Sequence, residues 1–599
     1  MAYNKNQKLE RLQKKVSKIT EIDNSFSGWR TLLFIFAFVL WCFVGIDMFP
    51  KIFLPVASAV SLAFIVTISF HRKVRKNLYL FKSRLNVEER QKAITDLDWE
   101  KIPYTDFRSI NLNIPYLTDL NIIGEFSIVK LLNRTTSISG FKRLIELFLS
   151  NDVINAEIKR RKDLVNELKS LKIFRYAFLS HMGVNPKPID AQKISTLLKE
   201  SLSSVQSFAY FIPMLFIQIA FLTSFVMAMI GRGNKTLLIA TFILVVIENT
   251  RLRKKVKTGE AYGWSVSASH YLDSFRLAVQ ILEKFNGIKK PELSKILAVF
   301  APENSVSSRI KKLEQVSGAL GVRQNFIVHG IVHLFTPWDI LWTYRLDKIR
   351  QQIKNDLPIW EKALSEIEAF LSLAMYAEAN LDFCDAHVTT GSILIDAKNL
   401  RHPLIPKDRA VGNPIVINDT EKCILITGSN MSGKSTFMRS IGVNYLLAKV
   451  GAPVAAESFN FDNEPLYTSL SGGDSLQEGL SSFYAEVKRL KDILEATKSK
   501  KSVLFLIDEI FRGTNNRERL TGSQAYIKEI VSIGGKGVVT SHDLELAQLE
   551  QLNIGIANYH FRETIKDSEM SFSYEKQKGP CPTTNALQVM KLNGLPVSL

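Results

Sequence analysis

A glycine-rich loop carries the most recognisable chemistry in this sequence. It follows G-x-x-x-x-G-K-[ST] from Gly428 to Ser435, after the apolar run 424–426 and before a stretch typical of a helix. Glycines let backbone N–H groups turn toward phosphate oxygens, and a helix N-terminus adds partial positive charge. In this pattern Lys434 reaches the outer phosphates and the hydroxyl of Ser435 holds Mg²⁺. The loop therefore predicts an ATP·Mg²⁺ site, and the residues expected to line it are Gly428, Ser429, Asn430, Met431, Ser432, Gly433, Lys434, Ser435 and Thr436.

Two carboxylates and a histidine follow later in the chain, each at the end of an apolar run. The run 503–507 ends in Asp508 and Glu509, and the run 538–540 is followed by Ser541 and His542. A carboxylate at such a strand end can bind Mg²⁺, and its neighbour can polarise an attacking water. His542 can sense the γ-phosphate or orient water, although a structural histidine is the alternative. We therefore expect ATP hydrolysis with Glu509, His542 and Lys434 as catalytic residues, and Ser435 and Asp508 at the metal.

A third segment lies between these two groups. Residues 470–474 imitate the L-S-G-G-Q signature of ABC transporters, but they follow Lys434 by only about forty residues, too few for a transporter's intervening helical region. Ser481 is the other candidate, because it opens a predicted helix. Free N–H groups there could bind the γ-phosphate of a nucleotide held by a neighbouring subunit. A plain N-cap is the alternative for Ser481.

Four apolar runs suggest contact with a membrane. They cover residues 31–46, 52–70, 208–230 and 236–247. The second and third reach the roughly 17–25 residues of a spanning helix, the first is slightly short and the fourth clearly short. Short turns between the runs predict two helical hairpins. Lysines and arginines flank them, so the positive-inside rule predicts a multi-pass protein of the inner (cytoplasmic) membrane with its ATPase in the cytoplasm. Buried core helices, or a re-entrant fourth run, are the alternatives.

Charge also points to an anionic partner. The 599 residues include 77 Lys and Arg against 58 Asp and Glu, a formal net charge of +19. This excess favours nucleic acid or an acidic membrane face, with an ordinary basic protein as the alternative. The N-terminal residues Leu9, Leu12, Val16 and Ile19 share helical spacing among lysines and predict an amphipathic helix on lipid or on a partner, or a solvated lead-in. Four scattered cysteines suggest neither a disulfide framework nor a zinc site, and no cleavable signal peptide is evident.

Taken together, the motifs resemble the MutS family of DNA mismatch-repair ATPases. The family's T-G-P-N-M-x-G-K-S-T corresponds to TGSNMSGKST at 427–436. Further matches are SSFYAE at 481–486, DEIFRGT at 508–514, TSH at 540–542 and RHP at 401–403. LLNRTT at 131–136, followed by Gly140 and Arg143, resembles the start of the family's helical core. The resemblance covers about 390–599 with specific motifs, and about 115–380 more weakly.

The resemblance implies an ABC-type ATPase that forms a homodimer with composite sites. Asn430, Lys434, Ser435, Asp508, Glu509 and His542 would act on their own subunit's nucleotide, and Ser481 on the partner's. The expected fold is an α/β C-terminal P-loop ATPase with an all-α MutS-like core and lever region and two transmembrane helical hairpins. The expected domains are a basic N-terminal segment at 1–30, transmembrane hairpins at 31–76 and 206–249, a helical core at 77–205, a lever region at 250–380 and the ATPase at 381–599.

Departures from the family limit what carries over. A membrane hairpin takes the place of a mismatch-reading domain, and no credible Phe-x-Glu reading motif or DNA clamp is found. The family's proline is Ser429 here, and its G-R-G-T is FRGT at 511–514. These features indicate a membrane-associated MutS-like subgroup.

Three functions compete on the sequence. The first is a membrane-anchored MutS-like ATPase coupled to DNA binding, with protein partners unknown. The second is a membrane mechanoenzyme that acts on lipid or a protein partner without a nucleic-acid role. A substrate-pumping ABC transporter is less favoured, because four short runs give a thin pathway and the signature lies in the wrong place.

Overall fold

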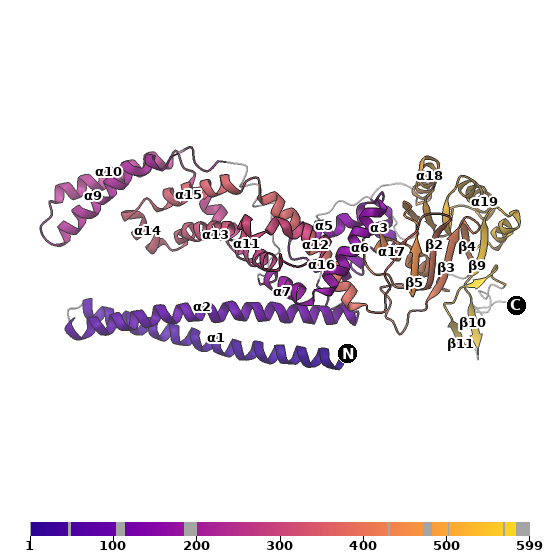
Figure 1. Cartoon of the computed structure of the whole chain (residues 1–599), viewed down its shortest axis with the longest axis horizontal. Coiled ribbons are helices and arrows are strands. Elements are labelled where there is room, and N and C mark those ends of the chain that lie inside the picture. Colours follow the sequence, from indigo (N-terminus) through magenta and orange to yellow (C-terminus); the bar gives the residue numbers. More distant parts are fainter. Residues whose placement is uncertain are drawn as a thin grey trace. The chain divides into compact units, whose positions relative to one another are not determined.

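A computed structural model describes residues 2–45, 50–103, 114–184, 201–205, 207–428, 432–470, 482–500, 502–566 and 569–582. The protein is mixed α/β and mostly helical, and Figure 1 shows its elements. It divides into two compact units. The first unit contains Met1–Glu89, Thr135–Gly140 and Lys172–Ile367, and the second contains Arg90–Arg134, Phe141–Leu171 and Glu368–Leu599.

Helices make up most of the described chain. The α-helices are α1 (Ala2–Gly45), α2 (Pro50–Thr95), α3 (Pro115–Asp119), α4 (Ile128–Leu132), α5 (Ile138–Leu149), α6 (Asn155–Ser170), α7 (Lys172–Met182), α9 (Ile212–Met229), α10 (Lys235–Arg253), α11 (Thr258–Phe285), α12 (Pro291–Leu297), α13 (Val306–Gly321), α14 (Phe326–Phe335), α15 (Trp338–Ile353), α16 (Leu357–Ala379), α17 (Lys434–Lys449), α18 (Ser482–Lys500) and α19 (Asn516–Ser532). Short 3₁₀ helices are η1 (Phe208–Phe211), η2 (Ala298–Phe300), η3 (Pro302–Asn304), η4 (Val322–Gln324) and η5 (Leu544–Leu552). The predicted boundary between residues 76 and 77 falls inside α2.

In the first unit, α1 and α2 lie side by side and antiparallel (Figure 1). Phe34 packs on Phe64 and Phe43 on Phe53, with ring centroids 5.8 and 5.5 Å apart. α9 and α10 form a second pair, in which Phe221 packs on Phe242 at 5.9 Å.

Three helices in the described part of the chain are long and apolar enough to cross a membrane. They cover Asn6–Val44, Phe53–Thr95 and Phe208–Met229. The fourth predicted run, which forms part of α10, is not among them, so two complete transmembrane hairpins remain a prediction.

The second unit is built around β-sheets. The strands are β1 (His387–Val388), β2 (Ile393–Leu400), β3 (Asn413–Asn418), β4 (Cys423–Thr427), β5 (Ser458–Phe461), β6 (Leu466–Ser469), β7 (Leu504–Ile507), β8 (Lys536–Ser541), β9 (Ile556–His560), β10 (Glu563–Lys566), β11 (Glu569–Phe572) and β12 (Gln577–Lys578). The largest sheet has the order β12-β9-β4-β8-β7-β6, and a four-stranded sheet has the order β1-β5-β2-β3. β10 and β11 pair with each other.

The six-stranded sheet positions the predicted site. Its five strands β9, β4, β8, β7 and β6 are parallel, and every residue of β4 and β7 is buried, as expected for strands covered on both faces. Thr427 in β4 is in register with Ser541 in β8, and Ile507 in β7 with Val539 in β8. The carboxyl ends of these three strands therefore meet at one edge, the usual ligand-binding edge of a parallel sheet.

Candidate nucleotide-binding site

The loop after β4 has the backbone that a phosphate cradle needs. Gly428 has φ +137°, and a Cβ there would lie 2.2 Å from the carbonyl oxygen of Phe561. Gly433 has φ +104°, and a Cβ there would lie 3.1 Å from Cδ1 of Tyr574. Both positions therefore require glycine. Gly433 also precedes the first residue of α17 and offers no side-chain cap, so the N-terminus of this helix lies at the loop.

Lys434 is buried and turns back across this loop. Its Nζ donates a hydrogen bond to the carbonyl oxygen of Gly428 at 2.6 Å. Ser432 is buried, Ser435 is half-buried and Thr436 is exposed. Ser429, Asn430, Met431 and Ser481, which were predicted to contact nucleotide, lie outside the described residues, as does most of the 470–474 segment. The described residues on either side of 429–431 thus supply glycine backbone, an ammonium group and hydroxyls.

Thr540 links the two carboxylates that follow β7. Its hydroxyl donates to Oδ1 of the buried Asp508, and it accepts the backbone N–H of Glu509 at 3.1 Å. β7 and β8 are neighbours in the sheet, so one side chain of β8 fixes the start of the loop after β7. Sequence analysis assigned no role to Thr540, although it lies in the quoted TSH segment.

Glu509 and His542 are in direct contact. His542 Nε2 lies 2.7 Å from Oε1 of Glu509, and Arg512 Nε lies 3.3 Å from the other carboxylate oxygen. The hydrogen bond from His542, followed by the charges of His542, Arg512 and Lys434, lowers the pKa of Glu509 and outweighs the effect of its partial burial. Glu509 is therefore a carboxylate at neutral pH, held on both oxygens.

The backbone around Glu509 is strained, and neighbouring groups hold it. Glu509 and Phe511 have φ of +51° and +57°, in the left-handed region that residues other than glycine rarely adopt. The N–H of Phe511 donates to Oε1 of Glu486 in α18. A strained conformation persists where surrounding contacts define it, and this one orients the carboxylate of Glu509 toward His542.

A two-point ion pair fixes the loop that carries His542. Arg519 in α19 donates from Nε and Nη2 to the two carboxylate oxygens of Asp543, at 2.8 and 2.7 Å. Sequence analysis missed both residues. Nothing local in the sequence links them, because the pair exists only once α19 lies beside the end of β8.

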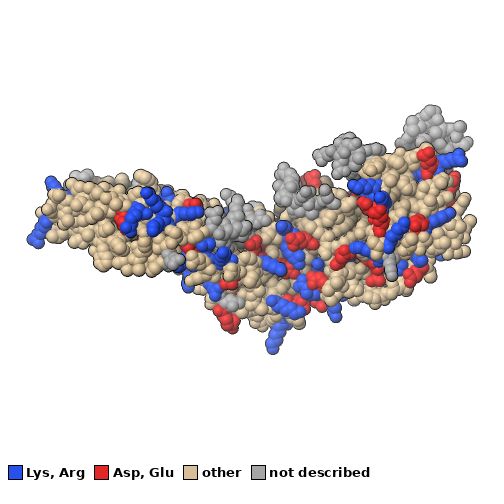
Figure 2. All heavy atoms as spheres, turned by 90° about the horizontal axis from the view of Figure 1, so that it is seen from above, with Lys and Arg blue, Asp and Glu red and all other residues tan. Residues whose placement is uncertain are grey.

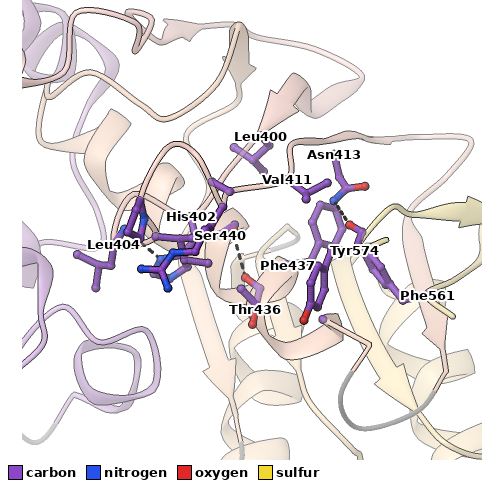
Figure 3. Close-up of a pocket in the computed structure, with 15 residues that line it drawn as sticks. Leu400, His402, Leu404, Val411, Asn413, Thr436, Phe437, Ser440, Phe561 and Tyr574 are labelled. Atoms are coloured by element: carbon purple, nitrogen blue, oxygen red, sulfur yellow. Dashed lines mark hydrogen bonds between the residues drawn. The ribbon is translucent and has the colours of Figure 1, made fainter. Parts of the chain in front are cut away.

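A cavity of about 650 Å³ adjoins the phosphate loop (Figure 3). Tyr574, Phe437 and Phe561 lie on one side of it, and His402 and Leu404 lie on the other. Asn413 positions Tyr574, because its Nδ2 donates a hydrogen bond to the carbonyl oxygen of Tyr574 at 2.9 Å. Burial, with a smaller contribution from Arg439, lowers the pKa of His402 to about 4, so its ring is neutral. An apolar and aromatic cavity beside a phosphate cradle suits a planar base.

Comparison with known proteins also relates the C-terminal part of the chain to MutS proteins. Residues 424–599 match the family model of MutS domain V. The DNA mismatch repair protein MutS of an Exiguobacterium species is 33% identical over 263 residues, which cover 42% of this chain and 30% of that protein. The DNA mismatch repair protein MutS of Lachnoclostridium phytofermentans is 30% identical over 354 residues, which cover 58% of this chain and 35% of the relative. The chain spans about a third of the length of these curated relatives, and the matches support the MutS family.

Proposed function

We propose that this chain binds ATP with Mg²⁺ and hydrolyses it as a membrane-anchored, MutS-like homodimer whose reaction is coupled to DNA. One observation supports the hydrolase activity. Parallel strands that end at the same edge of one sheet are followed by the four residues expected to act on ATP, Lys434, Asp508, Glu509 and His542. The remaining parts of the proposal rest on the comparisons, the charge and the apolar helices.

The residues at this edge fit a nucleoside triphosphate. The glycine loop and Lys434 would hold the phosphates, and the cavity beside Gly433 would hold the base. Ser435 and Asp508 would hold Mg²⁺, which neutralises charge on the phosphate oxygens. Among the described residues, no group of three or more His, Cys, Asp or Glu side chains could hold a metal ion, so the Mg²⁺ site would depend on the phosphates as well.

The roles of the side chains follow from their contacts. Glu509, ionised at neutral pH, would accept a hydrogen bond from the attacking water and take its proton. The water oxygen would then bond to the γ-phosphorus while the bond to the β–γ bridging oxygen breaks. His542 and Arg512 orient the carboxylate, and Lys434 offsets charge on the phosphates.

The names of the relatives favour DNA over the lipid or protein partner of a membrane mechanoenzyme. Both relatives described above are DNA mismatch repair proteins. The net charge of +19 supports an anionic partner. A homodimer would let Ser481 of one copy act on the nucleotide of the other. The three apolar helices support anchoring, and the basic flanks support an inner-membrane location with a cytoplasmic ATPase.

ATP hydrolysis by the detergent-purified full chain tests the proposal. The rate is measured with and without duplex DNA, at low and at high salt, with Glu509→Gln as the background. We expect stimulation by DNA that fades as salt rises, because phosphate contacts release counterions. A robust rate that ignores DNA but responds to phospholipid would move the assignment to the membrane mechanoenzyme. A rate no higher than that of Glu509→Gln would overturn the hydrolase itself.

A further inference from the structure

The short helix α14 has no part in the function proposed above. It covers Phe326–Phe335, and its ten residues, FIVHGIVHLF, include no Lys, Arg, Asp or Glu. Phe326 is 87% exposed and Val328 is 44% exposed. Exposed apolar side chains of this size on an apolar helix indicate a surface that meets something other than water.

The contacts of α14 place one end of it against the middle of α9. The ring of Phe335 lies 6.1 Å from that of Phe221 and 5.6 Å from that of Phe225. Both partners lie well inside Phe208–Met229, one of the three candidate membrane spans. If α9 crosses a bilayer, Phe335 therefore lies among the acyl chains.

The length of α14 limits how deeply it can enter a bilayer. Ten residues of α-helix extend about 15 Å, and the hydrocarbon core of a bilayer is about 30 Å thick. α14 can enter the membrane but cannot cross it. The chain turns at Thr336 and Pro337 and continues as α15, whose Tyr344 packs on Phe211 at the start of α9. α15 thus runs from the middle of α9 back to the N-terminal end of α9.

Basic and aromatic side chains mark that end of α9. Arg251 and Lys255 lie over the ring of Tyr210, at 5.7 and 5.0 Å from its centroid. In α15, Arg345 lies 4.7 Å from the ring centroid of Trp342. Tyr and Trp concentrate at membrane surfaces, and Lys and Arg are attracted to anionic headgroups. Seen from above, the end that holds α9 and α10 is mostly uncharged, with Lys and Arg at its outer tip and in a separate group farther along (Figure 2).

The histidine of α14 whose side chain the structure describes, His329, is paired. His329 Nε2 lies 3.0 Å from both carboxylate oxygens of Asp339, which is buried in the first turn of α15. The first turn of α14 is capped by Asn325, whose side chain accepts the N–H of Val328 at 3.1 Å. Pairing removes most of the cost of taking such groups out of water.

We infer that α14 is a re-entrant segment that inserts into a bilayer containing anionic phospholipid, to the depth of Phe221 and Phe225. The inference rests on the proposed membrane anchoring and is independent of ATP hydrolysis. It adds a membrane-embedded element to α9 and α10 and assigns the Tyr210, Arg251, Lys255, Trp342 and Arg345 group to the headgroup layer.

Spin labels on the full chain test whether α14 enters the bilayer. Cys42→Ser and Cys384→Ser remove the accessible thiols and leave the buried Cys423 and Cys581. Single labels then replace Phe326 in α14, Phe216 on the exposed side of α9 as the membrane reference, and the exposed Lys311 of α13 as the water reference. The protein is reconstituted in vesicles of equal parts phosphatidylcholine and phosphatidylglycerol. Collision rates with oxygen, which concentrates in lipid, and with a water-soluble nickel chelate are compared.

We expect the Phe326→Cys label to behave like the Phe216→Cys label, with high oxygen and low nickel accessibility. If it behaves like the Lys311→Cys label while Phe216→Cys reports lipid, the inference is wrong and the anchoring stands. If all three labels report water, the anchoring fails as well. Low accessibility to both reagents at residue 326, with spin–spin broadening that disappears on dilution with unlabelled protein, would show a second copy there instead and would also overturn the inference.

Discussion

The edge of the six-stranded sheet and the α9–α10 pair hold their side chains in place by different means. At the sheet edge, a few polar atoms meet at hydrogen-bond distances, as in the 2.7 Å contact of His542 with Glu509. Between α9 and α10, the ring centroids of Phe221 and Phe242 lie 5.9 Å apart. The hydroxyl oxygens of Ser224 and Thr241 lie 3.0 Å apart. Each polar group at the sheet edge has its own chemical role. The contacts between α9 and α10 all serve the same purpose, which is to hold the two helices together. Substitutions should therefore have steep effects at the edge and shallow effects between the helices.

Glu509→Gln should give the largest effect. The amide keeps the shape of the side chain but cannot take a proton from water, so kcat should fall by about 10²–10⁴-fold while ATP binding persists. Single-turnover hydrolysis and equilibrium ATP binding separate the two quantities. Glu495→Gln, on the exposed face of α18, is the matched control and should hydrolyse normally. Near-normal turnover by Glu509→Gln would contradict the steep effects expected at the sheet edge.

Lys434→Ala should weaken nucleotide binding. It removes the ammonium group that now reaches the carbonyl of Gly428 at 2.6 Å, so both binding and kcat/KM should fall, the latter by about 10²–10³-fold. Titration with a fluorescent ATP analogue measures the affinity. Lys491→Ala, at an exposed lysine of α18, should leave it unchanged. Unaltered affinity in Lys434→Ala would contradict the placement of the phosphates at this loop.

Two glycines with nearly the same φ can separate strain from function. Gly428 has φ +137° with the Phe561 carbonyl oxygen 2.2 Å from its would-be Cβ, and Gly391 has φ +136° with nothing within 4 Å. Alanine at either position should cost about 1–3 kcal/mol of strain. Only Gly428→Ala must also displace the phosphate loop, so only it should lose ATP affinity, by roughly tenfold or more. Thermal unfolding and ATP binding of both variants test this, and equal ATP affinities would show that the loop is not the cradle.

What the sequence could predict depends on how local each feature is. The loop before Lys434 and the apolar runs before Asp508 and His542 are contiguous, and β4, β7 and β8 lie where those runs predicted them. The Thr540 bridge and the Arg519–Asp543 pair are not local, because they require β7 and α19 to lie beside β8. The cavity needs Tyr574, which comes 141 residues after Gly433 in the chain, to fold over the loop. α14 escaped notice because a mostly apolar stretch of ten residues is too short to indicate a membrane span.

His542→Ala should change the pH dependence more than the maximal rate. The hydrogen bond from His542 is the main cause that lowers the pKa of Glu509, so its loss lets that pKa rise. Protonated Glu509 cannot act as a base. The acid limb of the kcat/KM profile should therefore move to higher pH, while Arg512 still holds the carboxylate at 3.3 Å. A pH profile of both proteins measures the shift. An acid limb that stays in place would mean that Glu509 is not the group whose ionisation the profile reports.

Thr241→Val should have the smallest effect. It removes the hydroxyl that pairs with Ser224 across α9 and α10, and such bonds between membrane helices contribute about 0.6 kcal/mol on average. The matched control is Thr223→Val, because that hydroxyl is exposed and bonds only within its own helix, to the carbonyl of Ile219 at 2.8 Å. Unfolding in mixed micelles, titrated with denaturing detergent, gives both free energies. A loss of several kcal/mol in Thr241→Val alone would mean that one polar contact positions these helices, as at the sheet edge. A difference below 1 kcal/mol would place their stability in the ring packing, which no single side chain controls.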